Sequence, residues 1–548
     1  MKKLLLIFGL LSVNQLANAQ NAYQNHSQLT SRLKALSARY GTNASVQSIG
    51  KSKGGRDIWA LTIGKGNVSQ KPAIAIIAGV DGAHLAGTEL AVQLAEKLLG
   101  SASDSVAKLF DTKTFYIVPG VNPDAQEQYA AKVKFERSGN DTDTDDDRDG
   151  RMNEDPFEDL NGDGLITQIR VEDPAGTYIL SKDDPRVLIK ADPAKGEIGK
   201  YLLITEGFDN DKDGLFNEDG VGGVNIDKNT TYDYPIFVAG SGEYAASEPE
   251  TRAILDFLYK NINIFAVLTF GPGNNLTEAV KFDKSKTTKR IITGVLEKDA
   301  AVGELVSKLY NSKTGLKDAP VLPLTKGSLA QTIYYHYGRF SFATPGWWTP
   351  KTLAPKDTSK KESPKVPATE NEDIKYLKWA EAQKIPNVFV NWQAVKHPDF
   401  ADKKAEVGGI APFVKWNPPV SFLAETADKH LKFLTALANQ MPEIQLLNVQ
   451  SEAVSAGLTR ITVQVINKGL LPTSAEIGDK VRWAQKIKTE LKLSGNQAIV
   501  SGRKINLRNA LASGEVQEYT WLISGSGSVT IESGVPTAGS KTVSVNLK

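Results

Sequence analysis

The sequence has no cysteine and contains only five histidines and three methionines in 548 residues. The lack of cysteine excludes disulfide bonds, thiolate metal sites, a cysteine nucleophile and a lipid anchor attached to cysteine. Neither sign of charge is in excess, because the formal net charge is only +2. The overall charge balance therefore predicts neither a nucleic-acid partner nor a membrane-surface partner.

Long apolar runs are also missing beyond the N-terminus, so no membrane span is expected, since a span takes roughly 20 residues. At the N-terminus, Lys2 and Lys3 precede an apolar stretch over residues 4–13 and the small-residue sequence Ala17-Asn18-Ala19. This order is typical of a signal peptide, which we assign to residues 1–19. The chain is then expected to be exported, either periplasmic or secreted. A buried N-terminal helix is the alternative interpretation.

A chain of 548 residues exceeds what one hydrophobic core usually organises, so at least two domains are expected. Up to about residue 440, continuous apolar strands alternate with helices. The expected strands include 58–63, 73–78, 114–119 and 265–270, and the expected helices include 87–99 and 248–259. This alternation predicts an α/β sheet that is covered on both faces. Ser247 is expected to be the N-cap of the helix over 248–259, with Glu250 completing a capping box.

The domain boundaries follow from changes in this pattern. The main domain is assigned to residues 20–440, and an Asp/Gly-rich insertion interrupts it at 141–223. Residues 350–373 are rich in Lys, Pro, Ser and Thr and are expected to form a solvated loop. After residue 440, short alternating segments such as 459–466 are separated by Gly/Ser turns. Residues 441–548 are therefore predicted to form a β-sandwich domain.

The insertion contains three loops with the pattern Asp-x-Asp/Asn-x-Asp-Gly. Their candidate ligands are Asp145, Asp147, Asp149, Asp159, Asn161, Asp163, Asp209, Asp211 and Asp213. Calcium needs six to eight oxygen ligands, and alternate carboxylates before a glycine turn supply several from one loop. None of the loops has glutamate at its twelfth position, so they resemble the calcium loops of extracellular repeat proteins more than sensor EF-hands. Structural calcium is predicted, and a solvated acidic turn is the alternative.

Several segments, in order, resemble the zinc carboxypeptidase family, the relatives of carboxypeptidase A. They are Gly50-x-Ser52-x-Gly54-Gly55-Arg56-Asp57-Ile58, residues 78–90 after a buried strand, Pro119-Gly-Val-Asn122-Pro123-Asp124, residues 223–229 with 242–251, and residues 327–342. The run Ser247-Glu248-Pro249-Glu250-Thr251 is quite specific to the family. The resemblance covers roughly residues 25–435.

The resemblance implies a three-layer α/β/α fold with a mixed, mainly parallel sheet and an active site at the strand ends. In the family, zinc is held by an H-x-x-E motif after one strand and by a histidine at the end of a later strand. An arginine polarises the scissile carbonyl, and an Asn-Arg pair binds the terminal carboxylate of the substrate. A glutamate activates the zinc-bound water.

Carried over residue by residue, the catalytic positions of the family are changed in this sequence. Asp81 and His84 stand where the first histidine and the glutamate ligand would be, and both residue types can bind zinc. The third ligand falls at Phe270 or Gly271, which have no donor side chain. The general base falls at Pro345, which has no proton acceptor. Zinc is therefore expected to be held weakly, if at all, and hydrolysis to be very slow or absent.

The substrate-binding positions of the family are changed as well. The Asn-Arg pair aligns with Asp227 and Lys228, and a carboxylate at this place repels the terminal carboxylate of a peptide. Arg137 matches the polarising arginine, and Tyr334 matches the tyrosine on the substrate side. The Trp347-Trp348 pair beside the base position is either an aromatic platform in the groove or part of the core.

The sequence leaves three functions open. The first is a catalytically impaired family member that binds a peptide or a cell-wall fragment in its groove, with His84 hydrogen-bonded and free of metal. The second is an active metallocarboxypeptidase in which His336 or Glu89 completes a rearranged zinc site, although Glu89 is also favoured at its position by the helix dipole. The third is a purely structural module carried with the β-sandwich.

Overall fold

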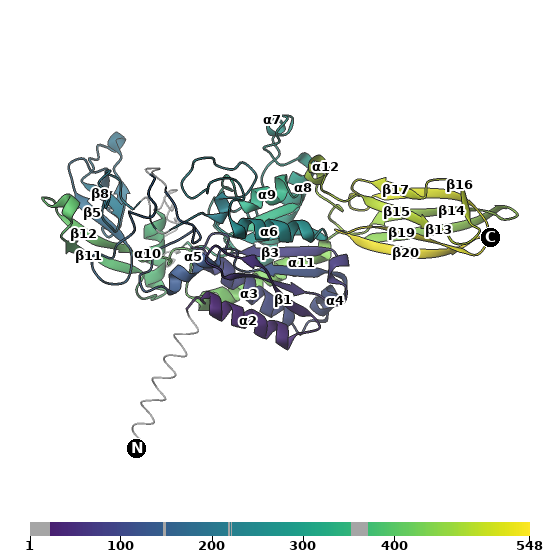
Figure 1. Ribbon diagram of the computed structural model, residues 1–548, viewed down its shortest axis with the longest axis horizontal. Coiled ribbons are helices and arrows are strands. Elements are labelled where there is room, and N and C mark those ends of the chain that lie inside the picture. Colours follow the sequence, from purple (N-terminus) through teal and green to yellow (C-terminus); the bar gives the residue numbers. More distant parts are fainter. Residues whose placement is uncertain (1–21, 146–149, 218–219, 221, 352–370) are drawn as a thin grey trace, which may run out of the picture.

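The computed structural model describes residues 22–145, 150–217, 220, 222–351 and 371–548. The predicted signal peptide lies outside these residues, as does most of the predicted solvated loop. Figure 1 shows a central sheet with helices on both faces, a smaller sheet on one side and a pair of sheets at the C-terminal end. Within the described ranges, no helix combines the length and apolarity that crossing a membrane requires.

The central sheet has six strands in the order β1-β2-β4-β3-β9-β10. Their bounds are β1 Ala44–Lys51, β2 Asp57–Ile63, β3 Ala73–Ala78, β4 Thr114–Val118, β9 Ile264–Phe270 and β10 Phe340–Thr344. Strands β1, β2 and β4 pair antiparallel, whereas β4, β3, β9 and β10 run parallel. β3, β4 and β9 are buried along their whole length, as their continuous apolar sequences predict for strands covered on both faces.

Helices cover both faces of the central sheet, and further helices lie outside these two layers. Their bounds are α2 His26–Arg39, α3 Leu85–Leu99, α4 Asp104–Thr112, α5 Pro123–Glu127, α6 Pro249–Lys260, α7 Lys284–Thr287, α8 Glu297–Thr314, α9 Leu329–Tyr335, α10 Glu372–Ala382, α11 Leu423–Gln440 and α12 Glu476–Val481. α2, α3, α4, α8 and α11 pack in one core with Ile76 of β3. α6 and α9 pack in a second core with Ile77, which points to the opposite face of the sheet. The expected three-layer α/β/α fold is confirmed.

The start of α6 differs from the expectation. Its N-cap is Glu248, and no side chain caps the helix. Glu250 instead accepts hydrogen bonds from the backbone N–H of Lys53 at 2.8 Å and from the side chain of Asn140 at 3.0 Å. The hydroxyl of Ser247 donates to the Glu248 carboxylate at 2.6 Å. The predicted capping box is therefore wrong, because both of its residues bind other groups.

The insertion builds most of a second sheet, with the strand order β11-β12-β5-β8-β6-β7 and antiparallel pairing throughout. Its strands are β5 Gln168–Glu172, β6 Tyr178–Leu180, β7 Leu188–Lys190, β8 Tyr201–Thr205, β11 Phe389–Val395 and β12 Ala405–Ile410. Ile169, Val171, Ala405 and Val407 form its small core. Two of the six strands thus come from a segment far beyond the insertion, which the sequence analysis did not anticipate.

The C-terminal part consists of two four-stranded antiparallel sheets, β13-β14-β18-β16 and β17-β15-β19-β20. Their strands are β13 Ile444–Ser455, β14 Leu458–Asn467, β15 Ile487–Lys492, β16 Ala498–Ser501, β17 Ile505–Arg508, β18 Val516–Ser524, β19 Ser528–Val535 and β20 Gly539–Asn546. Inward-facing residues of both sheets, including Ile461, Trp521 and Ile531, form the shared core. This is the expected β-sandwich.

Candidate functional site

The candidate metal ligands lie where the parallel strands of the central sheet end. Asp81 follows β3 by three residues, and His84 is the N-cap residue of α3. Phe270 is the last residue of β9, and Pro345 directly follows β10. Because the carboxyl ends of parallel strands share one edge of a sheet, these four positions fall in one region, as the family resemblance implies.

His84 is enclosed in this region. It is 4% exposed, and neither ring nitrogen has a hydrogen-bond partner. A methyl group placed on Gly87 would lie 2.7 Å from Nδ1 of His84 and 3.0 Å from the carbonyl oxygen of Phe270, so the ring is packed between α3 and the end of β9. Burial lowers the pKa of His84 to about 4, which the nearby Pro345 backbone only partly opposes. His84 is therefore a neutral ring at pH 7 and lacks the hydrogen bond that the metal-free interpretation assigned to it.

Asp81 lies beside His84 in a poorly solvated and acidic environment. Its Oδ1 accepts a hydrogen bond from the backbone N–H of Ala83 at 3.0 Å. The pKa of Asp81 is raised to about 6, mainly by burial and in part by the charge of Glu136, while the hydrogen bond from Ala83 and the charge of Lys228 oppose the rise.

Two residues that the resemblance aligns with the third zinc ligand and the general base, Phe270 and Pro345, are buried and apolar. Phe270 is fully buried and packs edge-on against the ring of His430, with 5.1 Å between ring centroids. Pro345 is buried as well. Among the residues that the structure describes, the only three His, Asp or Glu side chains that converge as for a metal are Asp209, Asp211 and Asp213. The residues around Asp81 and His84 therefore do not fit the family's zinc site.

The two candidate replacement donors have other partners. Both carboxylate oxygens of Glu89 accept hydrogen bonds from Arg32, at 2.8 and 3.1 Å. His336 shares a hydrogen bond of 2.8 Å with the hydroxyl of Thr231 through Nδ1, and its ring lies against Tyr232. Neither arrangement supports a role in a rearranged zinc site.

Asp227 and Lys228 lie in the short 3-10 helix Ile226–Lys228. Oδ1 of Asp227 accepts from the backbone N–H of Leu329 at 2.9 Å. The pKa of Asp227 is raised to about 7, mainly by burial and in part by the charge of Asp81. Nζ of Lys228 donates to the carbonyl oxygen of Ala239 at 3.1 Å. The pair therefore does not present the two donor groups with which the family binds a carboxylate.

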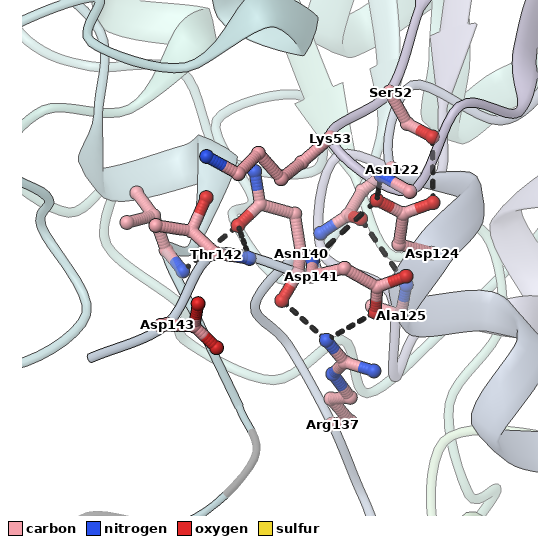
Figure 2. Close-up of polar contacts among 12 residues, drawn as sticks. Ser52, Lys53, Asn122, Asp124, Ala125, Arg137, Asn140, Asp141, Thr142 and Asp143 are labelled. Carbon is pink, nitrogen blue, oxygen red and sulfur yellow. Dashed lines mark hydrogen bonds and ion pairs between the residues drawn. The ribbon is translucent and has the colours of Figure 1, made fainter. Parts of the chain in front are cut away.

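Arg137 is held within its own loop, as Figure 2 shows. Its guanidinium donates to the carbonyl oxygen of Asn140 and forms an ion pair of 2.7 Å with Asp141. The side chain is 6% exposed, and its Nε has no hydrogen-bond partner. Arg137 is thus positioned by its neighbours and is largely closed to a ligand.

A polar network beside Arg137 was not identified from the sequence. The carboxylate of Asp124 accepts from the hydroxyl of Ser52 at 2.6 Å (Figure 2). It also accepts from the N–H of Gly54 at 2.8 Å and from Arg56 at 2.7 Å. Nδ2 of Asn140 donates to Glu248 and Glu250, at 2.8 and 3.0 Å. Apart from Asn140, these residues lie in three of the quoted family segments, which were the signal in the sequence. Their shared role is to hold the segments together.

Tyr334 has a structural role rather than the expected substrate-side role. It is 7% exposed, its hydroxyl donates to Oδ2 of Asp299 at 2.8 Å, and it accepts from the N–H of Leu296 at 3.0 Å. Burial and the charge of Asp299 raise its pKa far above the usual value. Asp299 also accepts from the N–H groups of Glu476 and Ile477, at 2.7 and 3.0 Å, and so binds the first turn of α12 to α8 and α9.

Trp347 and Trp348 belong to the interior. Each is 6% exposed, Trp347 packs against Trp379 with 5.2 Å between ring centroids, and Nε1 of Trp348 donates to the carbonyl of Lys317 at 2.8 Å. The aromatic platform is therefore wrong, and the core interpretation holds.

The acidic loops are described in part. Asp147 and Asp149 lie outside the described residues, and Oδ1 of Asp145 is buried without a partner. In the second loop, Asp159 accepts from the N–H groups of Gly162, Asp163 and Gly164, and Asn161 and Asp163 bond to one another at 3.1 Å. In the third loop, one oxygen from each of Asp209, Asp211 and Asp213 lies within 4.8 Å of the others.

A pocket of about 640 Å³ lies next to Lys228 and the first acidic loop. Its wall includes Ala239, whose carbonyl oxygen accepts from Lys228. Its charged and apolar lining residues include Lys53, Asp143, Asp145, Met152, Phe237, Val238, Glu243, Tyr244 and Glu248. Phe237 and Tyr244, which both line the pocket, are 79% and 54% exposed.

Comparison with known proteins gives the family. The zinc carboxypeptidase family model matches residues 29–350, and the model of a domain of unknown function matches residues 443–546. Carboxypeptidase D of Homo sapiens is 35% identical over 126 residues, which is 22% of this chain and 9% of that protein. Carboxypeptidase M of Mus musculus is 28% identical over 110 residues, 19% of this chain and 25% of that protein. The chain thus spans only a small part of the length of these relatives.

Solved structures are similar at low sequence identity. Thrombin activatable fibrinolysis inhibitor is 13% identical with a TM-score of 0.40, covering 76% of this chain and 73% of its own. Carboxypeptidase A of Helicoverpa armigera is 15% identical with a TM-score of 0.34, covering 59% of this chain and 63% of its own. Because the family model matches more than half of the sequence, the chain belongs to the zinc carboxypeptidase family.

Proposed function

We propose that this protein is a non-hydrolytic member of its family that binds a peptide or a cell-wall fragment. The observation that supports the proposal is that Phe270 and Pro345, which the resemblance aligns with the third zinc ligand and the general base, are buried and apolar. Catalytic zinc in this chemistry needs three protein ligands and a positioned water. Loss of the general base alone typically costs ~10²–10⁴ in rate.

The pocket beside Lys228 is the ligand site that this proposal uses. Its volume of about 640 Å³ is in the range of small-ligand sites. The carboxylates of Asp143 and Glu243 at its surface favour a ligand with a free amino group, and the exposed ring of Tyr244 favours apolar contact. A peptide with a lysine or another diamino residue has both features.

Calorimetric titration with a short lysine-containing peptide tests binding, and the same peptide with acetylated amines is the matched ligand. Binding is expected to weaken on acetylation and in Glu243→Gln, but not in Glu304→Gln, which removes an exposed acid from α8. The same samples, with zinc added, are assayed for release of the C-terminal residue. The proposal is contradicted if zinc remains near one equivalent after chelator washing and the residue is released, because the chain is then an active carboxypeptidase. Absence of binding to either peptide contradicts the pocket assignment.

We also propose that the protein is exported, which the order of charged, apolar and small residues at 1–19 supports. The lack of cysteine fits a chain that needs no oxidising compartment to fold. N-terminal sequencing of the protein recovered from the periplasm or medium is expected to begin at Gln20. Recovery of the intact N-terminus in the cytoplasm would contradict export.

Calcium is proposed for the acidic loops. The convergence of Asp209, Asp211 and Asp213 supports it, and so does Asn217, which stands at the ninth position of the same loop. Asn217 is 8% exposed, and its Oδ1 has no hydrogen-bond partner. Calcium is expected to raise the melting temperature of the chelator-treated protein. An unchanged melting temperature would contradict this site.

A further inference from the structure

A short projection leaves the main domain between β9 and α8. Residues 280–291, which we call the α7 projection, carry α7 and stand apart from the body of the protein at the top of Figure 1. The base of the projection is fixed to the domain. Leu276 before it is fully buried, and the carbonyl oxygen of Ile292 after it accepts from the hydroxyl of Tyr232 at 3.1 Å.

The projection has an ordered shape of its own. The carboxylate of Asp283 accepts from the N–H and the hydroxyl of Ser285, at 2.9 and 2.7 Å, and so caps α7. The N–H of Thr293 donates to the carbonyl oxygen of Lys286 at 3.0 Å, which ties the returning segment to α7. A ligand surface that is already shaped loses less entropy on binding than a free loop would.

The surface of the projection combines positive charge with apolar side chains. Its basic residues, all exposed, are Lys281, Lys284, Lys286, Lys289 and Arg290. They face one acid within the projection, Asp283, which lies 3.9 Å from Lys286. Val280 and Phe282 lead into α7 and are 46% and 38% exposed, and Ile291 leads out of it and is 71% exposed. Exposed apolar side chains do not help to keep a protein in solution. Where several of them lie together among basic residues, they mark a contact surface.

These features fit the surface of an anionic bilayer. Each lysine or arginine near such a surface strengthens binding about five-fold, and clusters of four to eight suffice for recognition. Apolar side chains beside the charges enter the boundary between headgroups and acyl chains, which a polyanion such as a nucleic acid does not offer. The whole chain is close to neutral, so attraction at this place is not a property of the net charge.

We propose that the α7 projection binds the surface of an anionic membrane, with its basic residues at the lipid phosphates and with Phe282 and Ile291 in the interface. This orientation attaches the protein to a bilayer as a peripheral protein, without a membrane-spanning segment. The proposal is independent of the peptide pocket, because it uses none of the residues that line it.

Sedimentation with phosphatidylcholine vesicles, with and without phosphatidylglycerol, tests the proposal on the whole protein. Binding is expected only with phosphatidylglycerol and is expected to weaken as salt is added. The triple variant Lys284→Gln, Lys286→Gln, Lys289→Gln is expected to bind about 100-fold more weakly. The control Lys480→Gln, Lys504→Gln, Lys541→Gln removes the same charge from exposed positions of the C-terminal part and is expected to bind like the wild type.

A second variant separates a membrane from a polyanion. Phe282→Ser with Ile291→Ser leaves every charge in place and is expected to weaken vesicle binding while binding to heparin is unchanged. The proposal is overturned if the wild type does not bind phosphatidylglycerol vesicles at low salt. It is also overturned if both triple variants lose binding equally, or if the serine variant binds vesicles as well as the wild type does.

Discussion

The carboxylate of Asp299 offers a direct measurement of how the C-terminal part is joined to the main domain. Asp299 is 4% exposed and accepts three hydrogen bonds, from the hydroxyl of Tyr334 and from the N–H groups of Glu476 and Ile477. In Asp299→Ala all three donors lose their acceptor. A buried donor left unpaired costs about 1–3 kcal/mol. The half-exposed Glu476 recovers a water, and removal of the buried charge offsets part of the loss, so about 3 kcal/mol is expected.

The variant Asp299→Asn tests the same joint by removing a single hydrogen bond. Its remaining oxygen can occupy the Oδ2 position and keep the bonds from Tyr334 and Ile477, while the new amide faces the N–H of Glu476. The loss of one bond out of three is expected to cost about 1 kcal/mol. Glu297→Ala is the control, because this acid lies in the same first turn of α8 but is exposed, and its effect is expected to stay within about 0.5 kcal/mol.

Scanning calorimetry and limited proteolysis measure the result. In calorimetry, the main domain and α12 of the wild type are expected to unfold together, whereas the C-terminal part of Asp299→Ala is expected to unfold at a lower temperature than in the wild type. In proteolysis, Asp299→Ala is expected to be cleaved before α12 faster than the wild type. If Asp299→Ala is as stable as Glu297→Ala and is cleaved no faster, the assignment of Asp299 as the joint is refuted.

Three further predictions concern buried charges and the acidic loops. The pKa of Asp227 rises from 3.8 to about 7 in the folded state, so stability is lost as the pH rises through this range. Asp227→Asn is therefore expected to increase the free energy of unfolding at pH 7. Urea unfolding should show that this increase vanishes at acid pH. Arg32→Ala leaves the buried Glu89 with no cationic partner and only the amide of Gln93 as a donor, and is expected to cost about 3 kcal/mol, whereas the exposed Arg39→Ala should change the free energy of unfolding little. In Asp209→Asn, the calcium concentration that gives half of the increase in melting temperature should rise; an unchanged titration would exclude the third loop.

Much of the central fold could be predicted from the sequence, because periodicity reports which residues face a core. The apolar run 73–78 matches β3 residue for residue, and the helix predicted over 87–99 begins only two residues late. The changed catalytic positions at Phe270 and Pro345 stay a prediction from the family resemblance. Whether Asp81 and His84 bind any metal stays a prediction.

The partners of individual side chains were harder to predict, because a pattern within one segment does not say which distant segment it meets. Glu89 looked like a residue of an early helical turn, and its bonds to Arg32 join positions 57 residues apart. Tyr334 matched a substrate residue in sequence and meets Asp299 in space. The basic surface of the α7 projection was not predicted, because the net charge is a sum over the whole chain and does not report a local cluster of basic residues.

The shared sheet of the insertion limits how the protein can be taken apart. Arg170 of β5 pairs with Glu406 of β12, 236 residues later, at 2.8 Å. Deletion of 141–223 would therefore leave β11 and β12 as a lone hairpin, which is marginally stable in water. It would also uncover the β12 edge that β5 now pairs, and such an edge invites pairing with another chain. The insertion is thus not a removable cassette, and a viable shortened protein would have to lose the segment 389–410 together with it.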